Sequence, residues 1–357
     1  MISRLLGNNR GIALLVTLGV ITVLIVATLE MNRHTRSALF SAAATRDRMT
    51  LSQMAASGIH AAKAILIADK NHSNSDSLQE DWADPEKISE ILADLPFDDG
   101  QITLTISDEL GKIQINSLVQ FPEGNEFNPT QRMLWDQFLN LLITQNEQFK
   151  EIEPETIINS AKDWMDSKDD DAITGLSGAE SDYYQDLDPP YPCRNGPFTY
   201  LDELALVKGI SRDLFQGADE SLGISNFLTI HGIIENADHS FTYDGKININ
   251  TAQLPILAAI LPLGHEDLAQ AIYDYRQETS DSVYIHDLSS ATWYKQVPGL
   301  GNIDIDPGLI TTSSDIFQLE SSAILHAMKL TITAIVKRER DKKTGKWVCK
   351  VLRWVTE

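Results

Sequence analysis

Hydrophobic residues are most concentrated near the start of the chain. The segment Ile12–Leu29 (IALLVTLGVITVLIVATL) carries no charged side chain. A helix of this length is just long enough to cross the hydrocarbon core of a membrane. The short leader before it is basic, with Arg4 and Arg10. This charge pattern predicts that the leader faces the cytoplasm and that the rest of the chain lies outside it.

A helical pattern continues beyond the apolar segment. From Met31 to Asp69 there is no proline and only one glycine, Gly58. Apolar residues recur at helical spacing, namely at Leu51, Met54, Ala55, Ala62, Ile65 and Leu66. We therefore predict one continuous helix from about Ile12 to about Asp69, with its first part in the membrane and its second part packed on a domain.

Alternation of apolar and polar residues predicts strands elsewhere. We expect them at Gln101–Ser107, Lys112–Asn116, Met328–Val336 and Trp347–Val355. A polar loop at Lys70–Glu80 and a short helix near Pro85–Leu95 precede the first of these. The strands at Gln101–Ser107, Met328–Val336 and Trp347–Val355 would form one antiparallel sheet against the long helix. This arrangement predicts an α+β, pilin-like fold.

An internal repeat lies between the early and late strands. Gly111–Ser117 (GKIQINS) returns as Gly245–Thr251 (GKININT). Helical segments follow each copy, at Pro129–Ile143 and Glu155–Met165, and at Leu254–Leu261 and Glu266–Gln277. A repeat of this length indicates duplicated modules. We predict an inserted all-α domain at 117–305, with related helix–hairpin–helix or SAM-like modules at 117–215 and 250–305, between two parts of an α/β domain at 70–116 and 306–357.

Composition limits the possible partners and disulfides. The net charge is −22, and such a surface repels nucleic acid and anionic lipid. The two cysteines, Cys193 and Cys349, would form one disulfide on the oxidising side of the membrane. The alternative is that both are small buried hydrophobic residues.

An acidic insertion, residues 166–197, distinguishes the first module from the second. It contains Asp166, Asp169, Asp170, Asp171, Glu180, Asp182, Asp186 and Asp188 among glycines and prolines. Hard oxygen ligands on such a loop suit Ca²⁺, although the spacing is not that of an EF-hand. The alternative is an acidic loop that is simply solvated.

Motifs for other chemistry are weak or absent. Leu201–Ile210 and Pro298–Gly301 resemble helix–hairpin–helix elements, but DNA binding would need nearby basic residues. Lys208 stands almost alone among acids, which favours a packing role for the hairpin. The sequence contains no HExxH, GxSxG or P-loop motif, and no GxGxxG follows a strand. We therefore expect no enzymatic activity.

The N-terminal segment has three interpretations. A cleaved signal peptide would use Ala42–Ala44, but charged residues and a long gap separate this site from the apolar run. A plain signal anchor is the second interpretation. In the third, Arg10-Gly11 before the apolar run resembles the signal of type IV pilins and pseudopilins, which is cut after the glycine and leaves Ile12 as the first residue. The uninterrupted helix favours this third interpretation.

Together these features resemble the minor pseudopilin K family of the type II secretion system. The resemblance covers nearly the whole chain. It is carried by Arg10–Leu15, Asp163–Asp166, Gly178–Glu180, Tyr183-Tyr184, Pro190-Tyr191, Asn195–Phe198, Leu201–Ile210 and Lys246–Ala252.

The resemblance implies cleavage by prepilin peptidase, a single-pass inner-membrane location and a periplasmic head that binds calcium. The implied ligand candidates are Asp166, Asp169, Asp170, Asp171, Glu180 and Asp182. The family tends to read Asp-x-Asp after the tryptophan, whereas this chain has Asp166-Ser167-Lys168, so the choice among these carboxylates stays open. Most pilins carry glutamate at the fifth mature position. This chain has Val16 there, and K members of the family also lack the glutamate.

The implied function is structural. The chain would sit at the tip of a pseudopilus with minor pseudopilins I, J and H and assist export of folded proteins across the outer membrane. A membrane-tethered helix–hairpin–helix receptor for DNA uptake is the alternative, and an inner-membrane hydrolase is a third possibility. The net charge of −22 argues against the DNA receptor, and the lack of catalytic motifs argues against the hydrolase.

Overall fold

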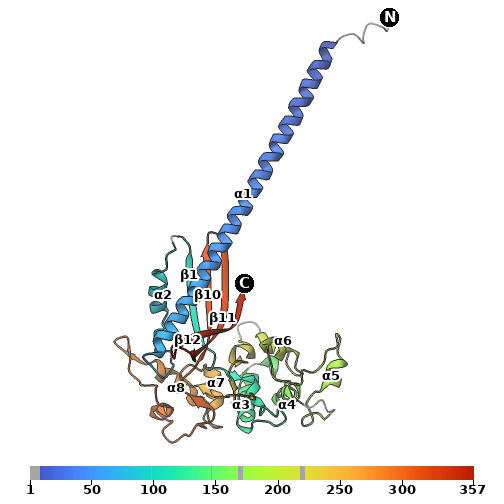
Figure 1. Ribbon diagram of the computed structural model, residues 1–357. Helices are drawn as coiled ribbons and strands as arrows, with labels where there is room; N and C mark the ends of the chain where they lie inside the picture. Colours follow the sequence, from blue (N-terminus) through green and yellow to red (C-terminus); the bar gives the residue numbers. More distant parts are fainter. Residues whose placement is uncertain (1–8, 98, 146, 168–171, 218–221) are drawn as a thin grey trace.

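A long helix projects from a compact head (Figure 1). The computed structural model describes residues 9–97, 99–145, 147–167, 172–217 and 222–357. Helix α1 spans Asn9–Lys70, 62 residues, which makes it about 90 Å long. The predicted continuous helix is therefore confirmed. Its apolar first part is exposed, and among the described residues it is the only helix long and apolar enough to cross a membrane.

The head contains a four-stranded antiparallel sheet. Its order is β1 (Gln101–Asp108), β10 (Ile316–Leu325), β11 (Met328–Arg340) and β12 (Trp347–Thr356). The C-terminal half of α1 crosses one face of this sheet, and α2 (Pro85–Ala93) lies beside β1 (Figure 1). The α+β class and the antiparallel sheet are thus as predicted.

Sheet and helix share one hydrophobic core. All the helix positions predicted from periodicity are buried, and the sheet contributes Leu104, Ile106, Phe317, Leu319, Ala323, Ile332, Ala334 and Val336. The closest approach is at Gly58, where an added Cβ would lie 2.2 Å from Oγ of Ser321 on β10. Only a residue without a side chain lets the helix and strand come this near.

Strand β10 was not predicted from the sequence, although it is a central strand. Two adjacent serines, Ser321 and Ser322, are both buried in it. They interrupt the apolar alternation that marks a strand. Ser321 is small because it faces Gly58, so a packing requirement of the helix removed the local signal.

The segment between β1 and β10 forms a second layer of the head, below the sheet in Figure 1. The first repeat copy leads into η1 (Ile115–Leu118), α3 (Pro129–Gln145), η2 (Glu147–Phe149), α4 (Pro154–Met165), α5 (Ser181–Gln185), η3 (Leu201–Leu206), α6 (Arg212–Gln216) and η4 (Ile224–Phe227). The second leads into α7 (Leu254–Ile260), η5 (Glu266–Leu268), α8 (Ala269–Gln277) and η6 (Trp293–Gln296). Their apolar side chains form one core that is separate from the core under α1.

The inserted segment is not all-α, which corrects that part of the prediction. Short strand pairs interrupt it: β2 (Ile113–Gln114) with β3 (Leu228–Thr229), β4 (Ile233–Glu235) with β5 (Phe241–Tyr243), β6 (Ile247–Asn248) with β9 (Ile310–Thr311), and β7 (Thr279–Ser280) with β8 (Val283–Tyr284). Each repeat copy supplies one strand of a parallel pair, β2 or β6. The predicted strand at Lys112–Asn116 is reduced to Ile113–Gln114, because the chain turns into η1.

The two cysteines are not linked. Cys193 and Cys349 are free and buried, one in each hydrophobic core. Burial raises the pKa of the Cys349 thiol to about 11, so it stays protonated at neutral pH. The disulfide interpretation is therefore wrong, and both residues pack as small hydrophobic groups.

The close contact at Gly58 yields a prediction. Replacing Gly58 with leucine should lower the free energy of unfolding of the full chain by about 3 kcal/mol, because the new side chain pushes α1 away from β10. Denaturant titration in non-ionic detergent measures this. Ser52→Leu, at an exposed position of the same helix, is the matched control. Equal stability of the two variants would contradict the packing argument.

Candidate functional site

The acidic insertion begins at the end of α4 and wraps back against that helix. Asp163, buried on α4, accepts hydrogen bonds from the backbone amides of Thr174 (3.0 Å) and Ala179 (2.9 Å). Gly178 passes so close that an added Cβ would lie 2.1 Å from Oδ2 of Asp163. Burial raises the pKa of the Asp163 carboxyl, and the amide hydrogen bonds oppose this effect. Asp163 thus fixes the conformation of the loop by accepting hydrogen bonds from its backbone.

Two lysines place positive charge inside the acidic insertion. Nζ of Lys162 lies 2.9 Å from Oδ2 of Asp166 and 3.1 Å from Oγ1 of Thr174. Nζ of Lys208 donates to the carbonyl oxygens of Ser177 (3.2 Å) and Gly178 (3.1 Å). The DNA-binding hypothesis required Lys208 to be available for phosphate groups. Its ammonium instead donates hydrogen bonds to the backbone of the loop.

The structure describes only part of the predicted metal set. Asp166 and Glu180 are both buried, with 8% and 6% of their surfaces exposed, whereas Asp182 is exposed. Asp169, Asp170 and Asp171 lie outside the described residues. Within the described part of the insertion, the carboxylates do not form a group of three with oxygens close enough to share one ion. The pair of buried carboxylates is consistent with a cation-binding loop but does not by itself establish one.

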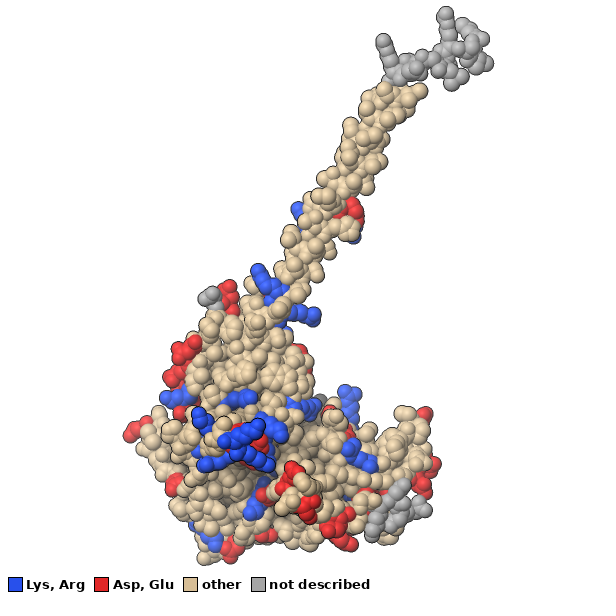
Figure 2. All heavy atoms as spheres, in the orientation of Figure 1, with Lys and Arg blue, Asp and Glu red and all other residues tan. Residues whose placement is uncertain are grey.

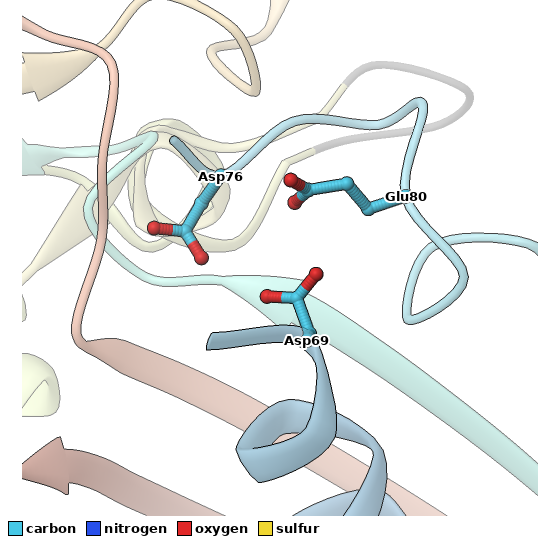
Figure 3. A group of neighbouring side chains, drawn as sticks. All are labelled: Asp69, Asp76 and Glu80. Atoms are coloured by element: carbon cyan, nitrogen blue, oxygen red, sulfur yellow. The ribbon is translucent and has the colours of Figure 1, made fainter. Parts of the chain in front are cut away.

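A different carboxylate group, which sequence reasoning missed, lies where α1 ends. Asp69 comes from the last turn of α1, and Asp76 and Glu80 come from the loop after it (Figure 3). One oxygen from each lies within 4.8 Å of the others. They point toward one another from two sides of the loop (Figure 3). Their closeness depends on how the chain folds back after Lys70.

Two basic side chains compensate part of the negative charge of this group. Arg338 on β11 donates to Asp76 and to Oδ2 of Asp69, the latter at 2.9 Å. The Lys70 ammonium lies 3.4 Å from Oδ2 of Asp76, and Glu80 accepts from the Trp82 indole at 2.8 Å. Burial and the neighbouring carboxylates raise the pKa of Asp69 to about 6, against the opposing effect of Arg338. The fixed guanidinium makes this group a buried ion-pair network rather than a cation site.

The same network links three parts of the head. The Asp76 amide donates to the Thr312 carbonyl at 2.8 Å, and the Asp76 carbonyl accepts from the Asn248 side chain at 3.0 Å. The Arg338 guanidinium also donates to the Leu66 carbonyl at 3.0 Å. Helix α1, the sheet and the second repeat copy therefore meet at Asp76. We call the ion-pair network of Asp69, Asp76, Lys70 and Arg338 the helix-end joint.

The two repeat copies contact each other reciprocally. A Cβ on Gly111 would lie 2.7 Å from Oγ1 of Thr251, and one on Gly245 would lie 2.8 Å from Oγ of Ser117. Each glycine of the repeat thus faces the hydroxyl residue of the other copy. Asp108 at the end of β1 reinforces the contact by accepting from Thr251 at 2.6 Å. Burial raises the pKa of this carboxyl to about 6.

The predicted processing site lies at the far end of the molecule. Gly11 and Ile12 are exposed near the start of α1, and an added Cβ on Gly11 would meet nothing within 4 Å. Val16, one turn on, is also exposed. The site is therefore accessible, and the assignment as a cleavage site stays a prediction.

The chain is similar to several known proteins. A family model described as type II secretion system (T2SS), protein K, matches residues 111–220, which include the acidic insertion. Protein K of the type II secretion system of Aeromonas hydrophila is 25% identical over 210 residues, 58% of this chain and 61% of that protein. The chain thus spans less than two thirds of this relative. Protein K of Klebsiella pneumoniae is 26% identical over 259 residues, 71% of each chain.

The resemblance to type II secretion protein K is confirmed. A chain in the crystal structure of the GspK-GspI-GspJ complex from enterotoxigenic Escherichia coli has the same fold, with a TM-score of 0.60 over 88% of this chain and 99% of that chain at 19% identity. With this family likeness, the apolar part of α1 is a single inner-membrane anchor and the head is periplasmic.

The helix-end joint predicts a large effect of one substitution. Arg338→Met should lower the free energy of unfolding by about 3–5 kcal/mol, because it leaves buried carboxylates without their cation. Unfolding of the full chain in detergent measures this. Lys337→Met removes the neighbouring cation, whose contact with Asp315 is half-exposed and 3.8 Å long, and should cost less than about 1 kcal/mol. Similar losses would contradict the proposed role of Arg338.

Proposed function

We propose that this chain is a minor pseudopilin at the tip of a type II secretion pseudopilus, where it assists export of folded proteins across the outer membrane. The shape of α1 carries the proposal. Its second half packs on the sheet. Its first half extends away from the head, and the apolar side chains of this half are exposed. In water such a surface needs partners. A fibre of parallel helices supplies them once the helix leaves the membrane, since packed apolar helices replace lipid contacts.

Two features favour the tip over the body of the fibre. Val16 carries no carboxylate, so it offers no acceptor for the buried amino terminus of a subunit above it. The inserted segment widens the head well beyond the sheet and helix (Figure 1). Repeated stacking along a shaft would have to accommodate this bulk at every subunit. A terminal subunit needs neither the acceptor nor a compact outline.

The partners follow from the same proposal. Minor pseudopilins I, J and H would contribute the neighbouring helices, and prepilin peptidase would cut the chain after Gly11. The role is structural rather than enzymatic, in keeping with the likeness to protein K. The DNA-receptor alternative gains no support, since Lys208 is bound to loop carbonyls.

Gold-labelled antibody against the head, applied to isolated fibres, tests the tip position. We expect one label at a fibre end, with the isolated subunit beginning at Ile12 by N-terminal sequencing. The Gly11→Leu variant should keep its leader and be absent from fibres, whereas Gly19→Leu, in the same exposed stretch of α1, should behave like wild type. Labels spaced along the shaft would refute the tip model.

We further propose that the acidic insertion binds calcium. Asp166 and Glu180 support this, because both are buried carboxylates of the insertion. A carboxylate removed from water is costly unless it is neutralised. Lys162 forms an ion pair with Asp166, and a cation with oxygen ligands would add attraction for the carboxylates that crowd this loop. Asp169, Asp170, Asp171 and Asp182 are the remaining candidates.

Melting of the full chain in detergent, with calcium and with chelator, tests the site. Calcium should raise the unfolding free energy by about 2.7 kcal/mol when its free concentration is a hundred times the dissociation constant. The Asp166→Asn, Glu180→Gln double variant should lose this response, whatever its basal stability. Asp202→Asn with Asp213→Asn, both exposed outside the loop, should retain it. A wild-type melting temperature that ignores chelator would count against calcium.

A further inference from the structure

The C-terminal hairpin differs in charge from the rest of the molecule. The chain as a whole has a net charge of −22, yet Lys and Arg far outnumber Asp and Glu on the hairpin of β11 and β12. From residue 340 onward, the exposed basic residues of the hairpin are Arg340, Lys342, Lys343, Lys346, Lys350 and Arg353. Figure 2 shows this basic group on the face of the head where Figure 1 places the hairpin.

These six cations form no ion pair within the described part of the chain. Their neighbours Lys337 and Arg338 do, Lys337 with Asp315 and Arg338 in the helix-end joint. Arg340 lies over the Trp347 ring, 4.9 Å from its centre, and this contact leaves its charge uncompensated. Like charges so close together repel. A surface that keeps them together is suited to an anionic partner.

Strand β12 is also the open edge of the sheet. The opposite edge, β1, has α2 beside it, whereas among the described residues no strand pairs with the outer side of β12. Large apolar side chains are exposed along β12: Val351 by 38%, Leu352 by 43% and Trp354 by 42%. Proteins usually shorten or cover such edges, because an edge strand is a template for another strand.

The turn of the hairpin, with the cations around it, lies far from the inner membrane surface when α1 stands upright in the bilayer. Arg338 contacts the carbonyl of Leu66, so the turn at 341–346 lies near the Lys70 end of α1. Helix α1 extends about 60 Å from Leu29 to that end. Anionic lipid headgroups of the anchoring membrane are therefore excluded as the partner.

We propose that β12 binds an extended acidic segment of a partner protein by strand addition. Backbone hydrogen bonds to the open edge would supply affinity, as in other cases of β-augmentation. Glutamate or aspartate side chains of the segment would pair with Lys346, Lys350 and Arg353, and its apolar residues would cover Leu352 and Trp354. The inference is independent of the tip model, because it needs only the exposed hairpin.

The probe is a fluorescent peptide of alternating Glu and Val, about eight residues long to match the strand. Its binding to the full chain in non-ionic detergent is followed by fluorescence anisotropy. The Lys346→Glu, Lys350→Glu, Arg353→Glu variant should weaken binding at least about tenfold, and added salt should weaken wild-type binding. The variant Lys87→Glu, Arg132→Glu, Arg212→Glu carries the same charge change at exposed positions outside the hairpin and should bind like wild type.

Further probes separate strand addition from general attraction. A Lys–Val peptide should not bind, and a Glu–Val peptide with alternate amides N-methylated should bind far more weakly, because it cannot complete the ladder. Equal binding by the methylated peptide, or full displacement by a short single-stranded DNA, would overturn strand addition. Absence of Glu–Val binding, with aggregation of the hairpin variant, would mean that the cations only protect the edge from self-association.

Discussion

The buried pairing of Arg338 with Asp76 is the interaction on which the arrangement of the head depends. A fully buried guanidinium and a fully buried carboxylate are tolerated when each compensates the charge of the other and the carboxylate makes further hydrogen bonds. Asp76 meets this condition with the Ser314 amide at 2.9 Å and the Lys70 ammonium at 3.4 Å. Because these groups come from α1, the following loop, the sheet and its preceding turn, satisfying one charge positions all of these parts together.

The helix-end joint also explains how a large insertion can interrupt a small sheet. The chain leaves the sheet at Asp108 and returns at Ile316. Near these exits, Asp108 accepts from Asn248 at 2.8 Å, and Asp76 accepts from the same side chain through its carbonyl. One amide of the second repeat copy thus bridges the Asp108 carboxylate and the Asp76 backbone carbonyl. The inserted segment is therefore tied to the sheet by polar contacts, while its hydrophobic core remains separate.

Charge is distributed unevenly over this molecule, and each region handles it differently. In the helix-end joint, buried acids are compensated by Arg338 and Lys70. In the acidic insertion, Lys162 and Lys208 supply part of the compensation from flanking elements. On the C-terminal hairpin the exposed cations have no described counter-ion. The paired charges of the first region fit a structural role, whereas the cations of the hairpin, which pair with no described acid, direct attention to an external partner.

Several features could be predicted from the sequence because they depend on local periodicity. The long helix, strands β1 and β11, and the helices after each repeat copy all show an apolar period that holds within a short window. The resemblance of the acidic insertion to a known family was also visible, since its motifs are contiguous. In each case the physical determinant lies within neighbouring residues.

Other features were decided only by the tertiary structure. Strand β10 was not predicted because Ser321 packs against Gly58, which is far away in the sequence, and must therefore be small. The separation of Cys193 from Cys349 and the meeting of Asp76 with Arg338 likewise depend on which segments come to lie side by side. Periodicity indicates which face of a segment is buried, but it does not indicate which other segment packs against that face. The partners of a buried charge or a missing side chain are set by packing between distant segments, which no local pattern records.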